Sequence, residues 1–203
     1  MKPELLESAI CGEDRECVES LRGVREALLE LNRVSLKLSK LLRVNGLEKP
    51  LIKSVANIGE ARRELKEKFK VEDEELIDYA IRRALYMKLH RKVKASRDDM
   101  LCPLCGKPPT LIFFKKTDTG LFSGDIPHAR CSCGMEWEYN EWRCPRCEAD
   151  GRMLFEVSVS TSIPIELRKC KRCGYTLFVA RRIVGDKDYF HALASMVARG
   201  VEW

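Results

Sequence analysis

Apolar residues recur every three or four positions through the first half of the chain, a spacing that predicts amphipathic helices. The stripes run over residues 21–41, 51–69 and 77–89, and Pro50 suits the first turn of the second helix. The third stretch begins with acidic and ends with basic side chains, which favours a helix through its dipole. We therefore predict a small antiparallel helical bundle over residues 1–95.

The apolar period shortens from 3.6 toward 2 after residue 100, which predicts strands. Phe155, Val157 and Val159 should share one face of such a strand. Asp186 or Asp188 can cap a final short helix. That helix would place Phe190, Leu193 and Val197 on one face. Strand-like segments lie at 110–115, 136–142, 153–160 and 175–183.

Composition narrows the class of protein. The chain has 203 residues, of which 45% are hydrophobic and 33% charged, as in globular proteins. No apolar stretch is long enough to span a membrane, and the first residues lack the apolar core of a secretory signal. We expect a cytoplasmic protein, in which thiols stay reduced and cysteine pairs favour metal ions over disulfides. Intracellular disulfides, as hyperthermophiles use them, remain the alternative.

Eight of the ten cysteines form four close pairs after residue 100. A C-x-x-C turn supplies two thiolates, and a structural tetrahedral site needs four. Pairing the first turn with the second and the third with the fourth gives two tandem ribbons. The predicted ligands are Cys102, Cys105, Cys131 and Cys133 at site 1, and Cys144, Cys147, Cys170 and Cys173 at site 2. Iron and zinc both suit such sites.

Cys131 and Cys133 have one residue between them, unlike the other pairs. Gly134 follows Cys133 as Gly106 follows Cys105, which favours a turn shortened by one residue. The alternative is that His128 and Cys131 bind the metal and Cys133 stays free.

The remaining two cysteines do not fit this pattern. Cys11 and Cys17 have C-x5-C spacing, which is not typical of metal ligands. We interpret them as small buried apolar residues.

Both sites would be closed by four protein ligands, so we predict a protein that is not an enzyme.

The formal charge of +6 falls to about +2 once two four-thiolate sites hold divalent ions. This weakens the alternative of a nucleic-acid-binding double zinc ribbon. Such a protein would stack bases on aromatic residues and contact phosphates with arginines. The residues available for nucleic-acid binding are Trp137, Tyr139, Trp142, Arg143 and Arg146. A rubredoxin-like electron carrier is a further alternative.

The motifs "CPLCG", "CSCGMEW", "CPRC" and "CKRCG", in this order and with Pro109, resemble the formate dehydrogenase accessory proteins (the FdhE family). The resemblance covers about residues 100–200. It implies a helical region, two tandem rubredoxin-like modules that bind iron through these cysteines, and a short C-terminal helix. It also implies a cytoplasmic accessory factor that contacts the catalytic subunit of a formate dehydrogenase-like enzyme during its maturation. Two features depart from the family pattern: a single residue, Ser132, separates Cys131 from Cys133, and the neighbours of Cys170 are basic.

These observations predict an α+β protein in which a helical bundle precedes two four-cysteine modules. The expected parts are a bundle over 1–95, a linker over 96–101, modules over 102–142 and 143–185, and a helix over 186–203. The partner would be a protein, with neither a membrane nor a nucleic acid involved.

Overall fold

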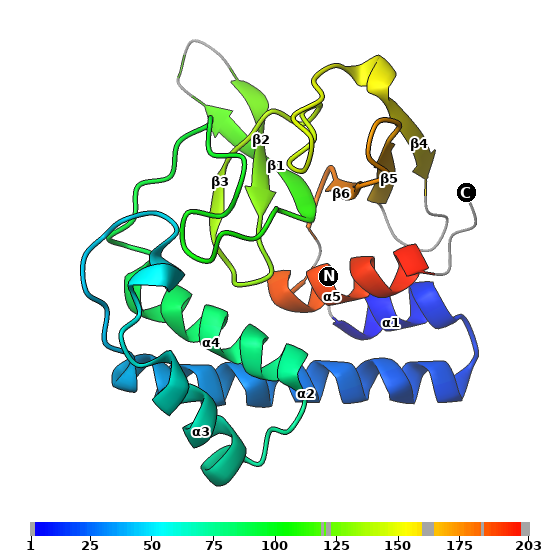
Figure 1. Ribbon diagram of the computed structural model, residues 1–203. Helices are drawn as coiled ribbons and strands as arrows, with labels where there is room; N and C mark the ends of the chain where they lie inside the picture. Colours follow the sequence, from blue (N-terminus) through cyan, green and yellow to red (C-terminus); the bar gives the residue numbers. More distant parts are fainter. Residues whose placement is uncertain (1–2, 119, 121–122, 160–164, 184, 200–203) are drawn as a thin grey trace.

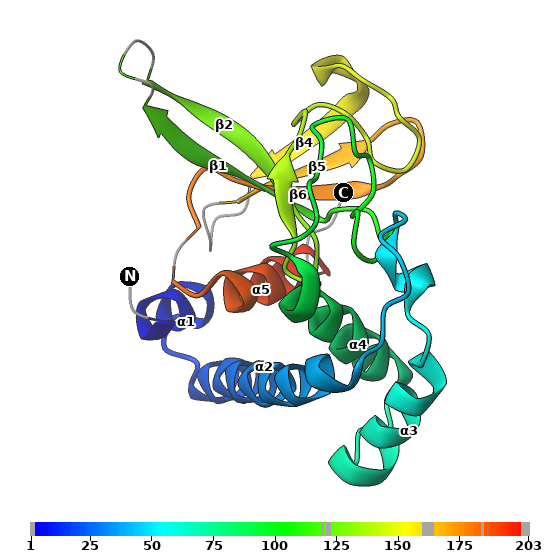
Figure 2. The same cartoon turned by 90° about the vertical axis from the view of Figure 1, so that its left-hand side faces the viewer.

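The computed structural model describes residues 3–118, 120, 123–159, 165–183 and 185–199. This part of the chain forms five α-helices, two short 3-10 helices and one six-stranded sheet (Figures 1 and 2). The sheet lies on one side of the molecule and the α-helices on the other. The helices are α1 (Pro3–Cys11), α2 (Arg15–Leu41), η1 (Leu51–Ser54), α3 (Ile58–Phe69), α4 (Glu74–Leu89), η2 (Arg152–Leu154) and α5 (Lys187–Arg199).

The helical half follows the sequence pattern, with one difference. α2 and α4 begin at aspartate caps: Asp14 accepts from the N–H of Cys17, and Asp73 accepts from that of Leu76. The second predicted helix is wrong over residues 51–57, where η1 and a break precede α3. The N–H groups of Leu51 and Ile52 bond to carbonyls of residues 103 and 104 in the first cysteine turn, at 3.2 and 2.8 Å. This tertiary pairing replaces the helix.

The sheet is built from two similar halves. Each half has a cysteine turn, two strands, a second cysteine turn and one more strand, as the predicted tandem repeat requires. The strand order is β3-β2-β1-β6-β5-β4, and the halves meet where β1 pairs with β6 in parallel. All other neighbours are antiparallel. The strands are β1 (Leu111–Asp118), β2 (Ser123–Arg130), β3 (Glu136–Glu138), β4 (Phe155–Val159), β5 (Ile165–Cys170) and β6 (Thr176–Ala180).

The predicted fold class is confirmed: helices precede two four-cysteine clusters, and a short helix follows them. The predicted domain boundaries stay predictions. One hydrophobic cluster contains residues from α2, α3 and α4 together with cysteines of both predicted modules. No described helix is long and apolar enough to cross a membrane.

Two details of the predicted core differ in the structure. Phe155 is buried, but Val157 and Val159 beyond it on β4 are exposed, because no described segment covers this end of the strand. Cys11 and Cys17 are not isolated buried residues: they form a disulfide between the end of α1 and the start of α2. A tight turn holds their chain segments together, with the N–H of Asp14 bonded to the carbonyl of Cys11 at 3.1 Å.

Helix α5 packs between the sheet and α2, where it fills a second hydrophobic cluster. Asp186 caps it by accepting from the N–H of Tyr189 at 2.9 Å. Phe190 and Leu193 are buried as predicted, and the side chain of Val197 lies outside the described residues. His191 is also buried, with Nε2 2.5 Å from the Thr110 hydroxyl oxygen. Burial lowers its pKa to about 4, so the ring is neutral at neutral pH.

A buried ion cluster joins α4, β2 and α5. The Asp188 carboxylate on α5 pairs with Arg83 of α4 and with Arg130 at the end of β2. Arg130 also pairs with Glu136 of β3, which is 2.9 Å from Lys187 Nζ. Both arginine side chains and Asp188 are almost entirely covered, so these ion pairs are desolvated.

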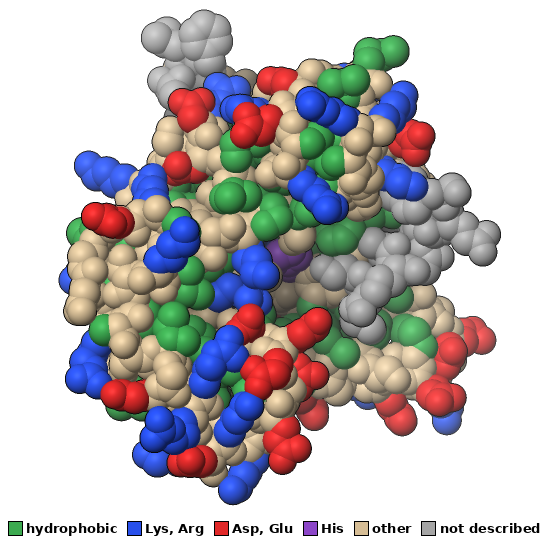
Figure 3. Space-filling view, viewed as in Figure 1, with side chains coloured by type: hydrophobic (Ala, Val, Ile, Leu, Met, Phe, Trp, Pro, Cys, Tyr) green, Lys and Arg blue, Asp and Glu red, His purple; other side chains and the backbone are tan. Residues whose placement is uncertain are grey.

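Outside this cluster, charges of both signs are interspersed. On the face seen in Figure 3, Lys and Arg side chains alternate with Asp and Glu over both the helices and the sheet. This face therefore carries no field of a single sign that would attract a phosphate backbone.

Replacement of Asp188 tests the ion cluster. Asp188→Ala leaves two buried guanidinium groups without a carboxylate, so we expect a loss of about 3–5 kcal/mol in the free energy of unfolding. The control is Asp186→Ala, two residues earlier, which removes the helix cap and should cost about 1 kcal/mol. Urea unfolding of the metal-loaded proteins measures both, and equal losses would contradict the role of the cluster.

Candidate metal centres

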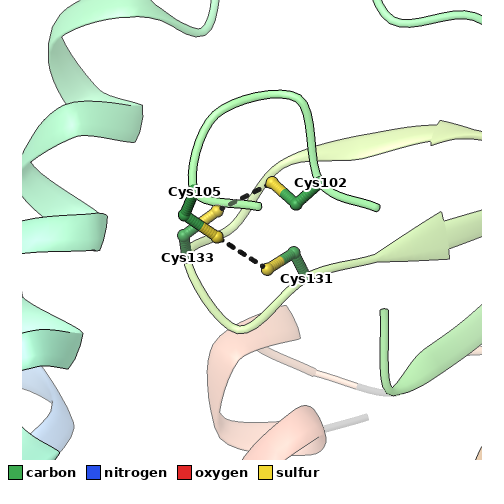
Figure 4. Close-up of side chains that lie close together, drawn as sticks. All are labelled: Cys102, Cys105, Cys131 and Cys133. Carbon is green, nitrogen blue, oxygen red and sulfur yellow. Dashed lines mark hydrogen bonds between the residues drawn. The ribbon is translucent and has the colours of Figure 1, made fainter. Parts of the chain in front are cut away.

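The first cysteine cluster lies between the helical half and the sheet. Cys102 and Cys105 come from the turn before β1, and Cys131 and Cys133 from the turn between β2 and β3. Their side chains point toward one another from two facing loops (Figure 4). The Sγ atoms of Cys102 and Cys133 are 3.6 Å apart, and those of Cys105 and Cys131 are 3.4 Å apart. All four cysteines are buried.

The second cluster, Cys144, Cys147, Cys170 and Cys173, comes from the turns before β4 and after β5. The Sγ atoms of Cys144 and Cys173 are 3.5 Å apart, and those of Cys147 and Cys170 are 3.6 Å apart. Cys147 and Cys173 are partly exposed, so this cluster is open to solvent on one side. A backbone hydrogen bond from Ala149 lowers the pKa of Cys147 to about 7, which favours its thiolate form.

Both clusters fit a thiolate-bound metal ion. A tetrahedron with metal–sulfur bonds of about 2.3 Å has edges of about 3.8 Å, close to the sulfur separations of 3.4–3.6 Å in the two clusters. Within each cluster all four ligand atoms lie within 4.8 Å of one another. Four sulfur donors without a water position suit zinc or iron in a structural role. The structure thus brings together the two sets of four cysteines that the sequence predicts.

The same backbone turn recurs at the three C-x-x-C pairs. The N–H of the first cysteine bonds to the carbonyl five residues on, and the N–H four residues on bonds back to the first cysteine. For Cys102 these partners are Lys107 and Gly106, at 2.9 and 2.8 Å. The turns at Cys144 and Cys170 have the corresponding bonds, at 2.8–2.9 Å.

The C-x-C pair keeps this turn with one residue removed. Cys131 N–H bonds to the carbonyl of Met135 at 3.0 Å, and Gly134 N–H bonds to the carbonyl of Cys131 at 2.9 Å. Each partner is one position nearer than in the longer turns. Cys133 lies in the cluster, whereas His128 lies on β2 with Nδ1 3.1 Å from the Ile126 carbonyl oxygen. The four-cysteine interpretation therefore fits this geometry, and the histidine alternative does not.

Arg83 packs closely against Gly134 at the short turn. Gly134 has a φ of +104°, and a Cβ there would lie 2.0 Å from Nη1 of Arg83. That same Nη1 donates to the carbonyl of Cys133 at 3.1 Å. Gly174 in the fourth turn has a φ of +72° but nothing within 4 Å of an added Cβ. Glu148 follows the second cysteine of the third turn, where the other three turns have glycine. It also adopts a positive φ, of +59°.

The two centres have different surroundings. Around the first, Arg83 and Arg130 donate to the carbonyls of Cys133 and Gly134, the latter at 3.4 Å. A divalent ion with four thiolates carries a net charge of −2, which these two buried cations partly balance. The turn at Cys102 is held by η1. The basic residues next to the cysteines of the second centre are exposed or partly buried: Lys171 and Arg172 are exposed, and Arg143 and Lys169 are partly buried.

The aromatic residues considered for nucleic-acid binding are mostly covered. Trp137 and Tyr139 are 3% and 1% exposed, and their polar atoms bond to backbone carbonyls of Asp99 and Arg143. The guanidinium of Arg168 lies 3.7 Å from the centre of the Trp142 ring. These rings belong to the core and its border, so stacking on bases is disfavoured.

Sequence reasoning missed three buried arginines, of which Arg83 and Arg130 contact the first centre. Arg168 is fully buried and pairs with Glu141 and Glu166, at 2.9 and 2.7 Å. Arg130 directly precedes Cys131, but Arg83 lies on a distant helix. Arg83 follows another arginine, Arg82, in α4, so the local sequence does not mark it as buried. Asp188, the carboxylate that pairs with Arg83 and Arg130, lies 105 and 58 residues away in sequence, so no spacing pattern reveals these pairs.

Comparisons with known proteins find similarity among solved structures alone. No protein-family model matches the chain, and no curated protein sequence matches it. Among solved structures, the chain is similar to the FdhE protein from Pseudomonas aeruginosa, with 18% sequence identity and a TM-score of 0.47. The similarity covers 71% of this chain and 58% of that one, so the chain spans less than two thirds of the FdhE structure.

Substitutions of two glycines test the close packing of Arg83 against the short cysteine turn of the first centre. Gly174→Ala should cost about 1–2 kcal/mol through its left-handed backbone alone. Gly134→Ala should cost several kcal/mol, about 3–5, because buried Arg83 must also leave its partners. Chemical denaturation measures the difference, and similar losses would contradict the close approach of Arg83.

Metal removal tests the number and exposure of the centres. The native protein should contain close to two equivalents of zinc plus iron, because eight cysteines form two clusters. A chelator should remove the metal in two phases, with the exposed second centre releasing its ion first. Cys173→Ser should abolish the fast phase and halve the metal content. A single equivalent in the wild-type protein, or loss of the slow phase in this variant, would contradict the assignment.

Proposed function

We propose that the protein is a cytoplasmic accessory factor for the maturation of a formate dehydrogenase-like oxidoreductase. It would act by binding the catalytic subunit through a scaffold that two thiolate-bound metal ions stabilise. In this role the chain is a binding protein and not an enzyme. The metal ions, iron or zinc, supply folding free energy and hold the turns in place.

One observation carries the proposal: four cysteine turns, in the order and sequence context of the formate dehydrogenase accessory proteins, pair into two closed clusters. The clusters are preceded by helices and followed by α5, the arrangement that this resemblance implies. The FdhE name of the similar solved structure is in line with the proposal. Four sulfur ligands leave no coordination position for a substrate, which supports a scaffolding role.

Electrostatics support a protein partner over a nucleic acid. With both metals bound the net charge is only about +2, so few counterions would be released from a phosphate backbone. The side chains that could stack on bases are committed to the core or covered by Arg168.

Co-purification tests this function. The chain should associate with the catalytic subunit of a formate dehydrogenase-like enzyme in its native host, and the association should survive physiological salt. Deleting the gene should lower that enzyme's activity more than its transcript. Nucleic-acid affinity should be no tighter than about 10⁻⁴–10⁻⁶ M, the non-specific range.

The opposite results would favour the nucleic-acid alternative. These are tight, salt-resistant binding to a defined RNA or DNA, together with enzyme activity that is unchanged by the deletion. Cys144→Ser serves as the metal control. It should make the second module sensitive to proteases and weaken association, because a ribbon of this size has too small a core to fold without its ion.

A further inference from the structure

The outer edge of β4 differs from the other edge of the sheet. β3, at the opposite edge, has three residues, two of which are glutamates. Short strands and charges of this kind protect an edge from pairing with another chain. β4 has five residues, and Val157 and Val159 are 48% and 68% exposed. Met153, just before it, is 82% exposed. β4 is longer and has a single charged residue, Glu156, so its edge is less protected than that of β3.

Backbone hydrogen bonds show which groups of β4 face outward. Lys171 N–H donates to the carbonyl of Leu154 at 2.9 Å, which fixes the alternation of the antiparallel ladder with β5. Glu156 and Ser158 therefore bond to β5, while Val157 and Val159 direct their N–H and C=O groups away from it. No described strand pairs with this edge. Two consecutive outward positions thus offer donors and acceptors to an added strand.

Exposed basic side chains gather at the start of this edge, and the acidic residues near it are Asp150 before η2, Glu156 on β4 and Glu166 opposite Val159. Arg152, Lys171 and Arg172 are exposed at the start of β4 and on the adjacent fourth cysteine turn. Figure 3 shows hydrophobic side chains beside Lys and Arg side chains over η2 and the start of β4. Glu156 is the single acidic residue of the strand, and its cross-strand neighbour is Lys169. The edge thus combines apolar side chains with a basic rim.

We propose that the β4 edge binds an extended, acidic segment of the partner protein as an added strand. The main chain would supply hydrogen bonds, Val157 and Val159 would contact apolar side chains at alternate positions, and the basic rim would pair with carboxylates. A second copy of this chain would bring the same basic rim, so charge complementarity favours an acidic partner. The proposal rests on the proposed function because this partner would be the catalytic subunit of the formate dehydrogenase-like enzyme.

Peptide binding tests the edge with the full metal-loaded chain. The probe is a fluorescent nonapeptide of alternating valine and aspartate, and its control has lysine in place of aspartate. Fluorescence anisotropy at physiological salt should show at least about tenfold tighter binding of the acidic peptide, as one or two charge-assisted contacts would give. Equal binding of the two peptides would overturn the proposal.

Val157→Pro removes an outward N–H without touching the ladder to β5, and proline is tolerated at such edge positions. It should weaken binding of the acidic peptide by about tenfold, the effect of one or two lost hydrogen bonds. Val157→Thr keeps the N–H and should have little effect. Circular dichroism and metal content check folding.

If the proline variant does not fold, the double variant Arg152→Glu, Lys171→Glu should reverse the preference toward the lysine peptide. Unchanged binding in the variant that folds would contradict the proposal.

Two further outcomes separate this proposal from the others. A wild-type dimer in light scattering that Val157→Pro dissociates would place a second copy on the edge and overturn the acidic partner. Association of Val157→Pro with the catalytic subunit at wild-type strength would overturn the β4 edge and leave the proposed function intact. Peptide results as expected, with no association of the wild-type chain with the enzyme, would support the edge and reject the proposed function.

Discussion

The arrangement of the molecule depends on one carboxylate, that of Asp188, between two buried guanidinium groups. Arg83 comes from α4, Arg130 from β2, and Asp188 from α5, so the cluster joins three parts of the chain that are distant in sequence. Both arginines also donate to carbonyls of the short cysteine turn, at Cys133 and Gly134. Because unpaired buried charges are costly, these contacts persist only together. The first metal centre is therefore part of the interface between helices and sheet.

The two centres have the same donor set but different environments. The first is fully buried, pressed against η1 and α4, and carries buried cations beside its carbonyls. The second has two partly exposed cysteines and lies next to β4, which has no described strand on its outer side. A net charge of −2 costs more free energy in the buried position, and Arg83 and Arg130 offset part of that cost. The first centre thus links the two halves of the molecule, and the second supports the β4–β5 hairpin, which carries the proposed binding edge.

Much of this could be predicted from sequence because the signals are local. Cysteine spacing identified the two clusters, including the shortened turn at Cys131 and Cys133, since Gly134 marks the turn. Apolar stripes identified α2, α4 and α5. What was missed depends on distant partners. The 3-10 turn at 51–54 pairs with the first cysteine turn, and residues 54–56 pair with residues 43–45, so no continuous helix forms there. The disulfide of Cys11 and Cys17 depends on how α1 meets α2. The parallel pairing of β1 with β6 has no local signature.

Hydrogen–deuterium exchange across α5 tests the coupling of the first centre to the helices most directly. The comparison is between wild-type protein, Cys131→Ser, which lacks a ligand at the first centre, and Cys170→Ser, which lacks one at the second. If the short cysteine turn and the Asp188 cluster hold α5 in place, amides of residues 190–194 should lose protection in Cys131→Ser and keep it in Cys170→Ser. Equal protection of α5 in the wild-type protein and Cys131→Ser would contradict the coupling.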